Sequence, residues 1–234
     1  MNCDRCKITI QNNEKLSSFV RIDGVSFSLR RCPSCSKCIG FQVPEGWCSI
    51  DQILKRDLQI SGLHPAISTE DKVIHYILRQ FLHNEDEYLK DDTRAIFDEP
   101  DKHDVVVLLW INGSAIGFYT LKSKGTWIEE TDEAYNMTTL DTIFIRKCHR
   151  RNGYCQEMLR HICASNNDED IGVSKPISPE MKAALQKFLT DQPHMRSRLW
   201  EINGTGGEGH QKLVWYVLAK EEKCRRTMYS GSEK

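Results

Sequence analysis

Apolar residues in two parts of the chain, alternating with polar ones in the first part and forming continuous runs in the second, predict β-hairpins. Residues 19–29 alternate around an Asp-Gly pair at 23–24, and residues 105–111 and 115–121 flank an Asn-Gly pair at 112–113. Both pairs favour the type I′ turn, which joins two strands through a two-residue loop. We therefore expect one hairpin near the start of the chain and another near its middle.

A stretch with helical periodicity lies between these hairpins. Ser68 is suited to be the N-cap of a helix, because acidic residues follow it in what would be the first turn. Apolar residues then recur every three or four positions over 73–82. We expect this apolar face to be buried, with His75, Arg79 and Gln80 lying off it.

The second half of the chain alternates between strand and helix patterns. Apolar runs predict strands at residues 139–145, 171–174, 198–203 and 212–219. Helices are expected after Gly153 and after Ser178, where Pro179 occupies the first helical position. The alternation predicts an α/β fold with a mixed sheet.

The composition is typical of a globular protein that is neither secreted nor membrane-spanning. The chain has 234 residues, of which 39% are hydrophobic and 28% charged, which suits one large domain or a medium domain with an appendage. No apolar run approaches the ~20 residues of a membrane span, and the first residues lack the pattern of a secretion signal. We expect a nuclear or cytoplasmic protein.

Charge is distributed unevenly along the chain. Residues 1–40 carry seven Lys and Arg against three Asp and Glu, whereas the remainder carries 25 against 30. A basic start could contact nucleic acid, but only Phe19 and Phe27 supply aromatic rings there, so protein docking is at least as well supported. The acidic residues of 84–104 and 129–133 suit a basic partner.

Cysteines concentrate at the same basic end. Five of the ten lie within the first 38 residues, and Cys3, Cys6, Cys32 and Cys35 form two Cys-x-x-Cys pairs. An intracellular chain keeps thiols reduced, so such pairs favour a metal over disulfides. Two pairs joined by a hairpin predict a zinc-ribbon-like segment with a structural zinc ion. Cys38 is an alternative ligand to Cys35, and scattered reduced thiols are the alternative to a metal site.

The segment after the expected strand 139–145 has the features of an anion site. A basic loop contains Arg150, Arg151 and Gly153 and leads directly into a helix. The first turn of a helix presents unpaired N–H groups, arginine adds charged donors, and glycine lets the backbone approach an oxygen closely. These features favour a phosphate or pyrophosphate, against the alternative of a solvated basic turn.

This loop resembles the acyl-CoA pyrophosphate loop of the GNAT superfamily of N-acetyltransferases, Gln/Arg-x-x-Gly-x-Gly/Ala. Arg150 and Gly153 match the motif, whereas Cys155 stands where glycine or alanine is usual. The similarity extends over residues 65–220, where the expected elements follow the family's order. It implies a GNAT-like mixed, mostly antiparallel sheet flanked by helices, and acetyl-CoA as the cofactor.

The resemblance also implies which residues would contact acetyl-CoA. The pantetheine would lie along the strand that carries Ile143 and Ile145. The pyrophosphate would lie on the loop and the start of the helix, at Arg150, Arg151, Asn152, Gly153, Tyr154 and Cys155. Cys155 could also have thiolate character at a helix N-terminus, although a packing role is the simpler interpretation.

The same resemblance implies a base that removes a proton from an acceptor amine before the amine attacks the thioester. Asp141 and Glu130 are the candidates, with Glu129 and Glu133 as alternatives. Many members of the family also place a tyrosine near the later helix, but residues 178–192 contain none. The motif for the cofactor is therefore better preserved than the catalytic residues.

A closer resemblance is to the small vertebrate family that includes the soluble lamin-associated protein. It is carried by residues 47–54, 115–119, 140–146 and 199–203, and it implies nuclear-envelope or lamin-linked partners. We expect a Cys-rich segment at 1–45, a GNAT-like acyltransferase domain at 46–220 and a polar tail at 221–234.

Three functions follow from these observations. The first is acetyl transfer to an amine, such as a lysine-containing protein or a polyamine. The second is an inactive GNAT-fold interaction or scaffold protein, and the third is a zinc-ribbon adaptor.

Overall fold

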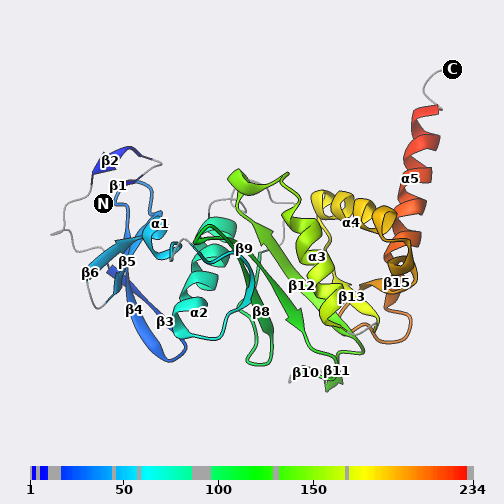
Figure 1. Ribbon diagram of the computed structural model, residues 1–234, viewed down its shortest axis with the longest axis horizontal. Helices are drawn as coiled ribbons and strands as arrows, with labels where there is room; N and C mark the ends of the chain where they lie inside the picture. Colours follow the sequence, from blue (N-terminus) through cyan, green and yellow to red (C-terminus); the bar gives the residue numbers. More distant parts are fainter. Residues whose placement is uncertain are drawn as a thin grey trace. The chain divides into compact units, whose positions relative to one another are not determined.

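The computed structural model describes residues 2–3, 6–9, 17–43, 46–56, 59–85, 96–128, 132–166 and 169–230 (Figure 1). The chain divides into two compact units. Unit 1 comprises Met1–Glu99, Val106–Phe118 and Phe144–His149, and unit 2 comprises Pro100–Val105, Tyr119–Ile143 and Arg150–Lys234. The cysteine-rich start of the chain therefore shares a unit with segments from its middle.

Unit 1 begins with a four-stranded antiparallel sheet in the order β3-β4-β5-β6. Its strands are β3 (Ser17–Ile22), β4 (Val25–Arg31), β5 (Cys38–Val43) and β6 (Gly46–Ser49), and β1 (Asn2–Cys3) pairs separately with β2 (Ile8–Thr9). Between β3 and β4, Asp23 and Gly24 have φ values of 53° and 79°, as a type I′ turn requires. The predicted N-terminal hairpin is confirmed.

The helix predicted after Ser68 also forms, and it continues with a wider winding. Unit 1 adds α1 (Ile50–Ile53), β7 (Gly62–Pro65), α2 (Thr69–Tyr76), the π-helix η1 (Ile77–Glu85) and β8 (Val105–Ile111). The Ser68 hydroxyl accepts a hydrogen bond from the Asp71 N–H, and the Asp71 carboxylate accepts one from the Ser68 N–H. This reciprocal pair is a capping box, which fixes where the helix begins.

The prediction that His75 and Arg79 lie off the buried face is wrong, because they are only 4% and 6% exposed. The helix is covered on two sides. Tyr76 packs edge-on against Phe41 of β5, and His75 packs edge-on against Phe118. A periodicity argument assumes one buried face, and the π-helical winding from Ile77 onwards further rotates the side chains away from 3.6-residue spacing.

One aromatic-rich core joins the N-terminal sheet to this helix and to the central hairpin. Its members from different elements include Phe41, Phe81, Trp110, Phe118 and Phe144. The rings of Phe41 and Phe81 are 5.8 Å apart, as are those of Phe118 and Phe144. The N-terminal strands therefore fold as part of the core of unit 1.

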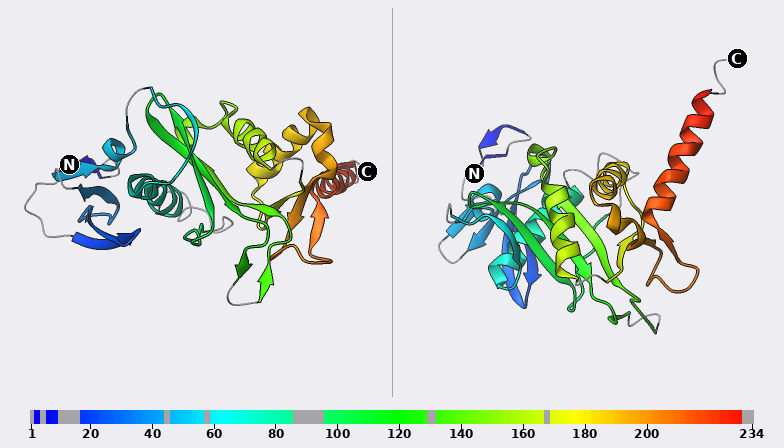
Figure 2. Two further views of the ribbon diagram at one scale, coloured as in Figure 1. Left: turned by 60° about the horizontal axis from the view of Figure 1, so that its bottom comes forward. Right: turned by 45° about the vertical axis from the view of Figure 1, so that its right-hand side comes forward.

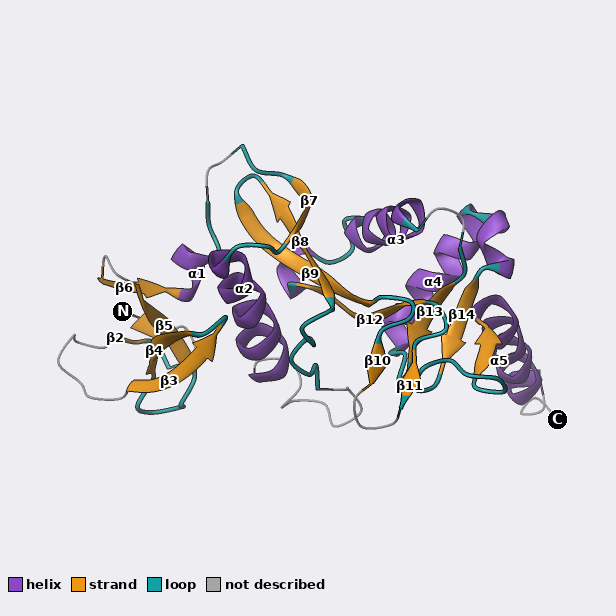
Figure 3. Ribbon diagram, turned by 90° about the horizontal axis from the view of Figure 1, so that it is seen from below, coloured by secondary structure: helices purple, strands orange, loops and turns teal. Residues whose placement is uncertain are grey.

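The central sheet has seven strands in the order β15-β14-β13-β12-β9-β8-β7. Its further strands are β9 (Ser114–Lys122), β12 (Thr138–Ile145), β13 (Ile171–Ser174), β14 (Leu199–Ile202) and β15 (Gln211–Leu213), and β10 (Trp127–Ile128) pairs separately with β11 (Glu133–Ala134). Strands β12, β13 and β14 are parallel, whereas β14–β15 and β7–β8 are antiparallel (Figure 3). The sheet is mixed, as predicted, and β8, β9 and β12 contribute residues to both units.

The remaining helices are η3 (Lys147–His149), α3 (Tyr154–Ser165), α4 (Pro179–Asp191), η4 (Pro193–Ser197) and α5 (Val214–Ser230). The predicted start of α4 is confirmed, since the Ser178 hydroxyl accepts a hydrogen bond from the Met181 N–H and Pro179 is the first helical residue. In α3 the side chains of Met158, Leu159 and Ile162 are buried, as the periodicity predicts.

The expected strand at 212–219 is wrong for most of its length. β15 ends at Leu213, and α5 then continues to Ser230, into the segment expected to be a polar tail (Figure 2). In a strand, Val214, Tyr216 and Leu218 would share one face, but Tyr216 is 69% exposed while the other two are buried. That spacing fits a helix. Among the described helices, α5 included, none combines the length and apolar composition needed to cross a bilayer.

Candidate functional site

Three of the predicted site residues share one face of β12. Alternate residues of a strand point to the same side, and Asp141, Ile143 and Ile145 are all half-buried. Thr142 and Phe144, between them, are buried on the other side. The candidate base and the two expected pantetheine contacts therefore line one partly accessible face.

The pairing of β12 with β13 ends partway along β12. The ladder comprises residues 138–140 of β12 and 171–173 of β13, with Leu140 opposite Val173 as its last pair. β12 continues to Ile145, whereas β13 ends at Ser174. The ladder between the two parallel strands therefore ends beside Asp141, at the start of the face described above.

The segment after β12 forms a turn that leads into α3. Gly153 is the N-cap of α3 with φ of 86°, and no side chain caps the helix there. The Gly153 carbonyl accepts hydrogen bonds from the N–H groups of Gln156 and Glu157. A Cβ on Gly153 would meet no atom within 4 Å, so glycine is required by the backbone conformation rather than by lack of space. The helix start offers backbone N–H donors in an open position.

The other predicted cofactor residues surround this turn. Arg151, with φ of 67°, and Asn152 are exposed, and Arg150 and Tyr154 are half-buried. The Asn152 side chain donates a hydrogen bond to the Arg150 carbonyl at 3.3 Å. Burial raises the pKa of Cys155 to about 11, so its thiol stays protonated at neutral pH and a packing role fits better than a reactive one.

Asp141 lies near a group of charges that the sequence analysis did not identify. The Lys122 ammonium donates hydrogen bonds to Asp101 at 2.7 Å and to Asp104 at 2.6 Å. Burial opposes the charge on Lys122, but these two bonds outweigh it and, with the nearby charge of Asp141, raise the pKa of Lys122. Burial also raises the pKa of Tyr135, an effect that Asp141 reinforces. Asp141 is therefore one member of a mixed-charge cluster.

The structure describes one of the other three candidate bases. Glu130, and the alternative Glu129, lie outside the described residues. Glu133 accepts a hydrogen bond from the Thr205 hydroxyl at 2.8 Å, which gives it a structural partner. Asp141 is thus the candidate base that the structure places on the expected strand.

A tyrosine–histidine pair is a further feature that the sequence analysis missed. The Tyr119 hydroxyl lies 2.7 Å from Nδ1 of His161 on α3. Burial raises the pKa of Tyr119 to about 12, while the His161 side chain belongs to an exposed residue. The pair joins a buried side chain of β9 to an exposed residue of α3. Nothing in the sequence marked it, because 42 residues separate the two and Tyr119 lies in an apolar run.

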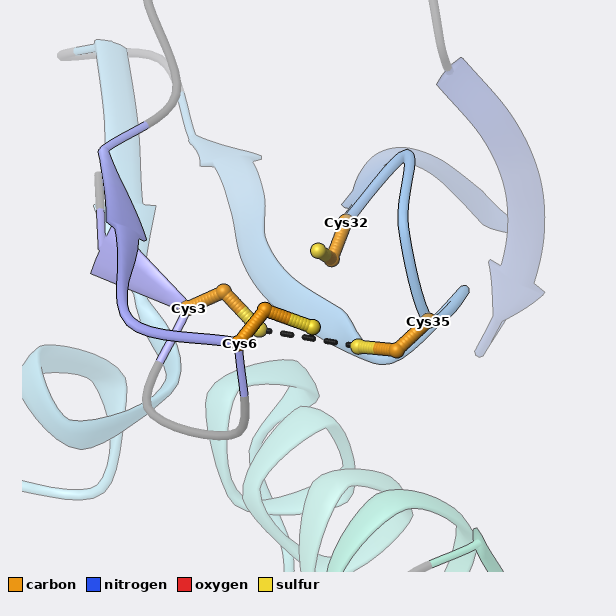
Figure 4. Close-up of side chains that lie close together, drawn as sticks. All are labelled: Cys3, Cys6, Cys32 and Cys35. Carbon is orange, nitrogen blue, oxygen red and sulfur yellow. Dashed lines mark hydrogen bonds between the residues drawn. The ribbon is translucent and has the colours of Figure 1, made fainter.

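The four predicted metal ligands lie together in unit 1. The Sγ atoms of Cys3, Cys6, Cys32 and Cys35 all lie within 4.8 Å of one another, and the group could hold a metal ion. Figure 4 shows the four side chains pointing toward a common centre from two separate segments. Cys38, the alternative ligand, instead donates a hydrogen bond to the Gly40 carbonyl at 3.7 Å and belongs to the main core.

The thiols of this cluster differ in acidity. Burial opposes ionisation of Cys32, but backbone N–H groups of Ser34 and Cys35 donate to its sulfur, and together with the other thiols they lower its pKa to about 7. The pKa of Cys6 is raised to about 12, chiefly by its hydrogen bond with Cys35. A metal ion would bind these groups as thiolates.

The middle of the chain, which includes the β12–α3 segment, is similar to a known family of proteins. Residues 71–173 match the model of the acetyltransferase (GNAT) family. The matched span covers less than half of the chain and includes most of α2, the central hairpin, β12, the loop and α3. With its mixed sheet flanked by helices, this part of the chain is similar to the GNAT acetyltransferases, as the loop motif predicted, and we refer to it as the GNAT-type domain.

The relatives extend the similarity along more of the chain. Protein FAM169B of Mus musculus is 32% identical over 199 residues, which cover 83% of this chain and 58% of that protein. Protein FAM169BP of Homo sapiens is 34% identical over 116 residues, covering 49% of this chain and 60% of the relative. The chain thus spans less than two thirds of each relative, and the predicted resemblance to a vertebrate family is confirmed.

Solved structures of bacterial enzymes are also similar. The aminoglycoside antibiotic 6′-N-acetyltransferase AAC(6′)-Ih of Acinetobacter baumannii has 17% identity and a TM-score of 0.38, covering 56% of this chain and 89% of that one. The AAC(6′)-IG enzyme of Acinetobacter haemolyticus has 15% identity and a TM-score of 0.36, covering 55% and 88%.

Proposed function

We propose that the GNAT-type domain transfers an acetyl group from acetyl-CoA to an amine. The observation that carries this proposal is the end of the β12–β13 ladder at Leu140 and Val173. Beyond it, β12 runs for five more residues, and η3 then leads to the turn at Gly153. An extended ligand could lie along this part of β12 and end at the start of α3.

The residues present suit two parts of acetyl-CoA, the pantetheine and the pyrophosphate. The pantetheine would lie beside Ile143 and Ile145, whose half-buried side chains offer an apolar surface. The pyrophosphate would accept hydrogen bonds from the first N–H groups of α3, where the helix dipole favours an anion. Arg150 and Arg151 would add charged donors. Acetyl-CoA itself supplies the reactive thioester.

Asp141 would act as the base. It would accept a proton from the acceptor amine, whose nitrogen then attacks the thioester carbonyl carbon; the carbon–sulfur bond breaks, and the thiolate of CoA takes up a proton. Asp141 lies near Lys122, whose pKa its negative charge helps to raise. The leaving thiolate would receive its proton from another donor, since α4 carries no tyrosine.

The acceptor in this proposal is a basic amine, such as a lysine-containing protein, because acidic residues are concentrated in the second part of the chain. The resemblance to the lamin-associated family adds nuclear-envelope or lamin-linked proteins as partners. The reaction would then take place in the nucleus or cytoplasm.

Calorimetric titration with acetyl-CoA and with CoA tests the cofactor site. Gly153→Glu should abolish binding, because it adds a negative charge and a strained side chain where the pyrophosphate would lie. Gly125→Glu is the matched control, since Gly125 has φ of 81° and also no atom within 4 Å of a Cβ. Arg150→Ala should weaken binding about tenfold, or about 1.4 kcal/mol. No heat of binding at millimolar ligand would contradict the proposal.

A second candidate is a GNAT-fold interaction protein without catalysis. It is favoured by the absence of a tyrosine from α4 and by Cys155 in place of the usual small residue. Acetylation of polyamines and lysine peptides by wild type and Asp141→Asn separates the two. Acetyl-CoA binding without transfer would favour the interaction protein, whereas transfer that Asp141→Asn reduces at least a hundredfold would support the enzyme.

A further inference from the structure

We propose that Cys3, Cys6, Cys32 and Cys35 bind one zinc ion, and that this centre is an integral part of unit 1 rather than a freestanding zinc ribbon. The inference is independent of the proposed acyl transfer.

The two Cys-x-x-Cys hooks, one with Cys3 and Cys6 and the other with Cys32 and Cys35, end in the same backbone conformation. In each, the residue after the second cysteine is left-handed: Lys7 has φ of 57° and Ser36 has φ of 58°. In each, the N–H of that residue donates a hydrogen bond to the carbonyl of the first cysteine, at 2.8 Å from Lys7 to Cys3 and from Ser36 to Cys32. Non-glycine residues seldom adopt positive φ. Two such turns that face one another indicate a common ligand.

The spacing of the sulfurs suits one tetrahedral ion. A Zn–S bond of ~2.3 Å places the sulfurs of a tetrahedron about 3.8 Å apart. The Sγ atoms of Cys3 and Cys35 are 3.6 Å apart, and all four lie within 4.8 Å of one another. A disulfide needs about 2.05 Å. Four sulfur ligands favour zinc over the oxygen-seeking cations magnesium and calcium.

The surroundings of the cluster supply what a tetrathiolate centre needs. Backbone N–H groups of Ser34 and Cys35 donate to the Cys32 sulfur, and such second-shell bonds orient a metal ligand. Four thiolates around a dication carry a net charge of −2. Lys7 and Lys37, each within two residues of a ligand cysteine in the sequence, can offset this charge, which gives a reason for the basic composition of the first 40 residues.

Arg31 connects the second hook to the helix of the GNAT-type domain. Its guanidinium donates to the Ser36 carbonyl at 2.8 Å and to both carboxylate oxygens of Glu85, at 3.0 and 3.2 Å. It also lies over the ring of Phe81, 5.5 Å from the ring centre. Glu85 and Phe81 belong to η1, so the hook and the helix share one bidentate ion pair.

Strand β5 provides a second connection. Ile39 packs with Cys3 and Cys32, while Phe41 belongs to the main core and contacts Phe81 of η1. The strand thus has the cysteine cluster on one side and the aromatic core on the other. Release of the metal would remove the support of β5 from one side, and we expect the loss of order to reach η1.

Metal analysis of the full chain tests the zinc site. Protein purified without added zinc should contain one zinc per chain, and Cys48→Ser, on β6 outside the cluster, should retain it. Cys3→Ser and Cys32→Ser should lose most of it. Less than about half an equivalent in the wild type, iron in place of zinc, or full retention in both variants would overturn the assignment.

Spectroscopy covers the case in which the serine variants do not fold. Cobalt exchanged into the wild type should give the visible absorption of a tetrahedral tetrathiolate site. Octahedral cobalt, or thiol titration that shows disulfides among these cysteines, would contradict the proposal.

Hydrogen exchange with and without a strong chelator tests the connection to unit 1. Chelation should accelerate exchange by at least tenfold in the hooks and also in β5 and η1. Acceleration confined to the hooks would leave the metal assignment standing and overturn the integral role. Glu85→Gln should retain zinc while raising exchange in η1.

Discussion

The two compact units are stabilised by different kinds of core. In unit 1 aromatic rings meet edge-on, and Phe41 alone packs against the rings of Phe27, Tyr76 and Phe81. In unit 2 the buried side chains are mainly aliphatic or methionine, among them Leu140, Met158, Leu159, Ile162, Ile171, Val173, Leu185, Leu189, Leu199 and Ile202. The aromatic core unites segments that the sequence separates widely, whereas the aliphatic one follows the alternation of strand and helix.

Among the substitutions that test this comparison, truncation of Phe41 should lower the unfolding free energy most. Phe41→Ala should cost about 4 kcal/mol of unfolding free energy, because it leaves a cavity and removes three ring contacts. Chemical denaturation measures the loss. Phe188→Ala, in α4, is the matched truncation: Phe188 is equally buried, and among the described residues no aromatic ring packs against it. It should cost at least about 1 kcal/mol less; equal costs would contradict the contrast between the cores.

Acid should weaken unit 1 through His75. Burial lowers the pKa of His75 to about 3, and repulsion from Arg79 adds to the effect, whereas an unfolded histidine titrates near 6.5. The unfolded state therefore binds the proton first, so stability is complete above about pH 6.5 and falls below it.

The expected loss from His75 is about 2 kcal/mol between pH 6.5 and pH 5, followed by urea denaturation at each pH. His75→Leu should flatten this part of the profile. His64→Gln, at an exposed position, should leave it unchanged, and a similar flattening in both variants would argue against a specific role of His75.

A methyl group at Gly172 should have a smaller effect, within unit 2. A Cβ there would lie 2.7 Å from the Thr139 hydroxyl and 3.1 Å from the Ile202 side chain, so Gly172→Ala should destabilise by about 1–2 kcal/mol through overpacking. Gly207→Ala is the control, since its Cβ meets no atom within 4 Å. Thermal unfolding measures both, and equal melting temperatures would show that the strands move apart without cost.

Local rules predicted much of the fold. The Asp-Gly and Asn-Gly turns, the Ser68 and Ser178 caps and the Cys-x-x-Cys hooks depend on residues close in sequence, and each forms where expected. The burial of His75 depends on a second covering layer, and the π-helical winding has no signal in a 3.6-residue pattern. The prediction of a strand at residues 212–219 was wrong because the apolar residues Val214, Tyr216 and Leu218 also fit the two-residue period of a strand.

The candidate site could be predicted only in part, for the same reason. The proposed anion-binding portion is a contiguous stretch of backbone, which a motif can reveal. The side chains around the proposed base are not contiguous in sequence: Asp101, Asp104 and Lys122 surround Asp141, and Tyr119 likewise meets His161 across 42 positions. That such groups lie close together can be known only when the strands that carry them have been placed side by side.

The two-sided covering of α2 and η1 also has an evolutionary consequence. A helix at the surface can change half of its residues freely, because water accepts many side chains. This helix contacts the N-terminal sheet on one side and Phe118 on the other, so few of its positions can vary alone. Among relatives, residues 73–81 should change slowly and in concert with β5 and β9, while the exposed positions of α5 drift.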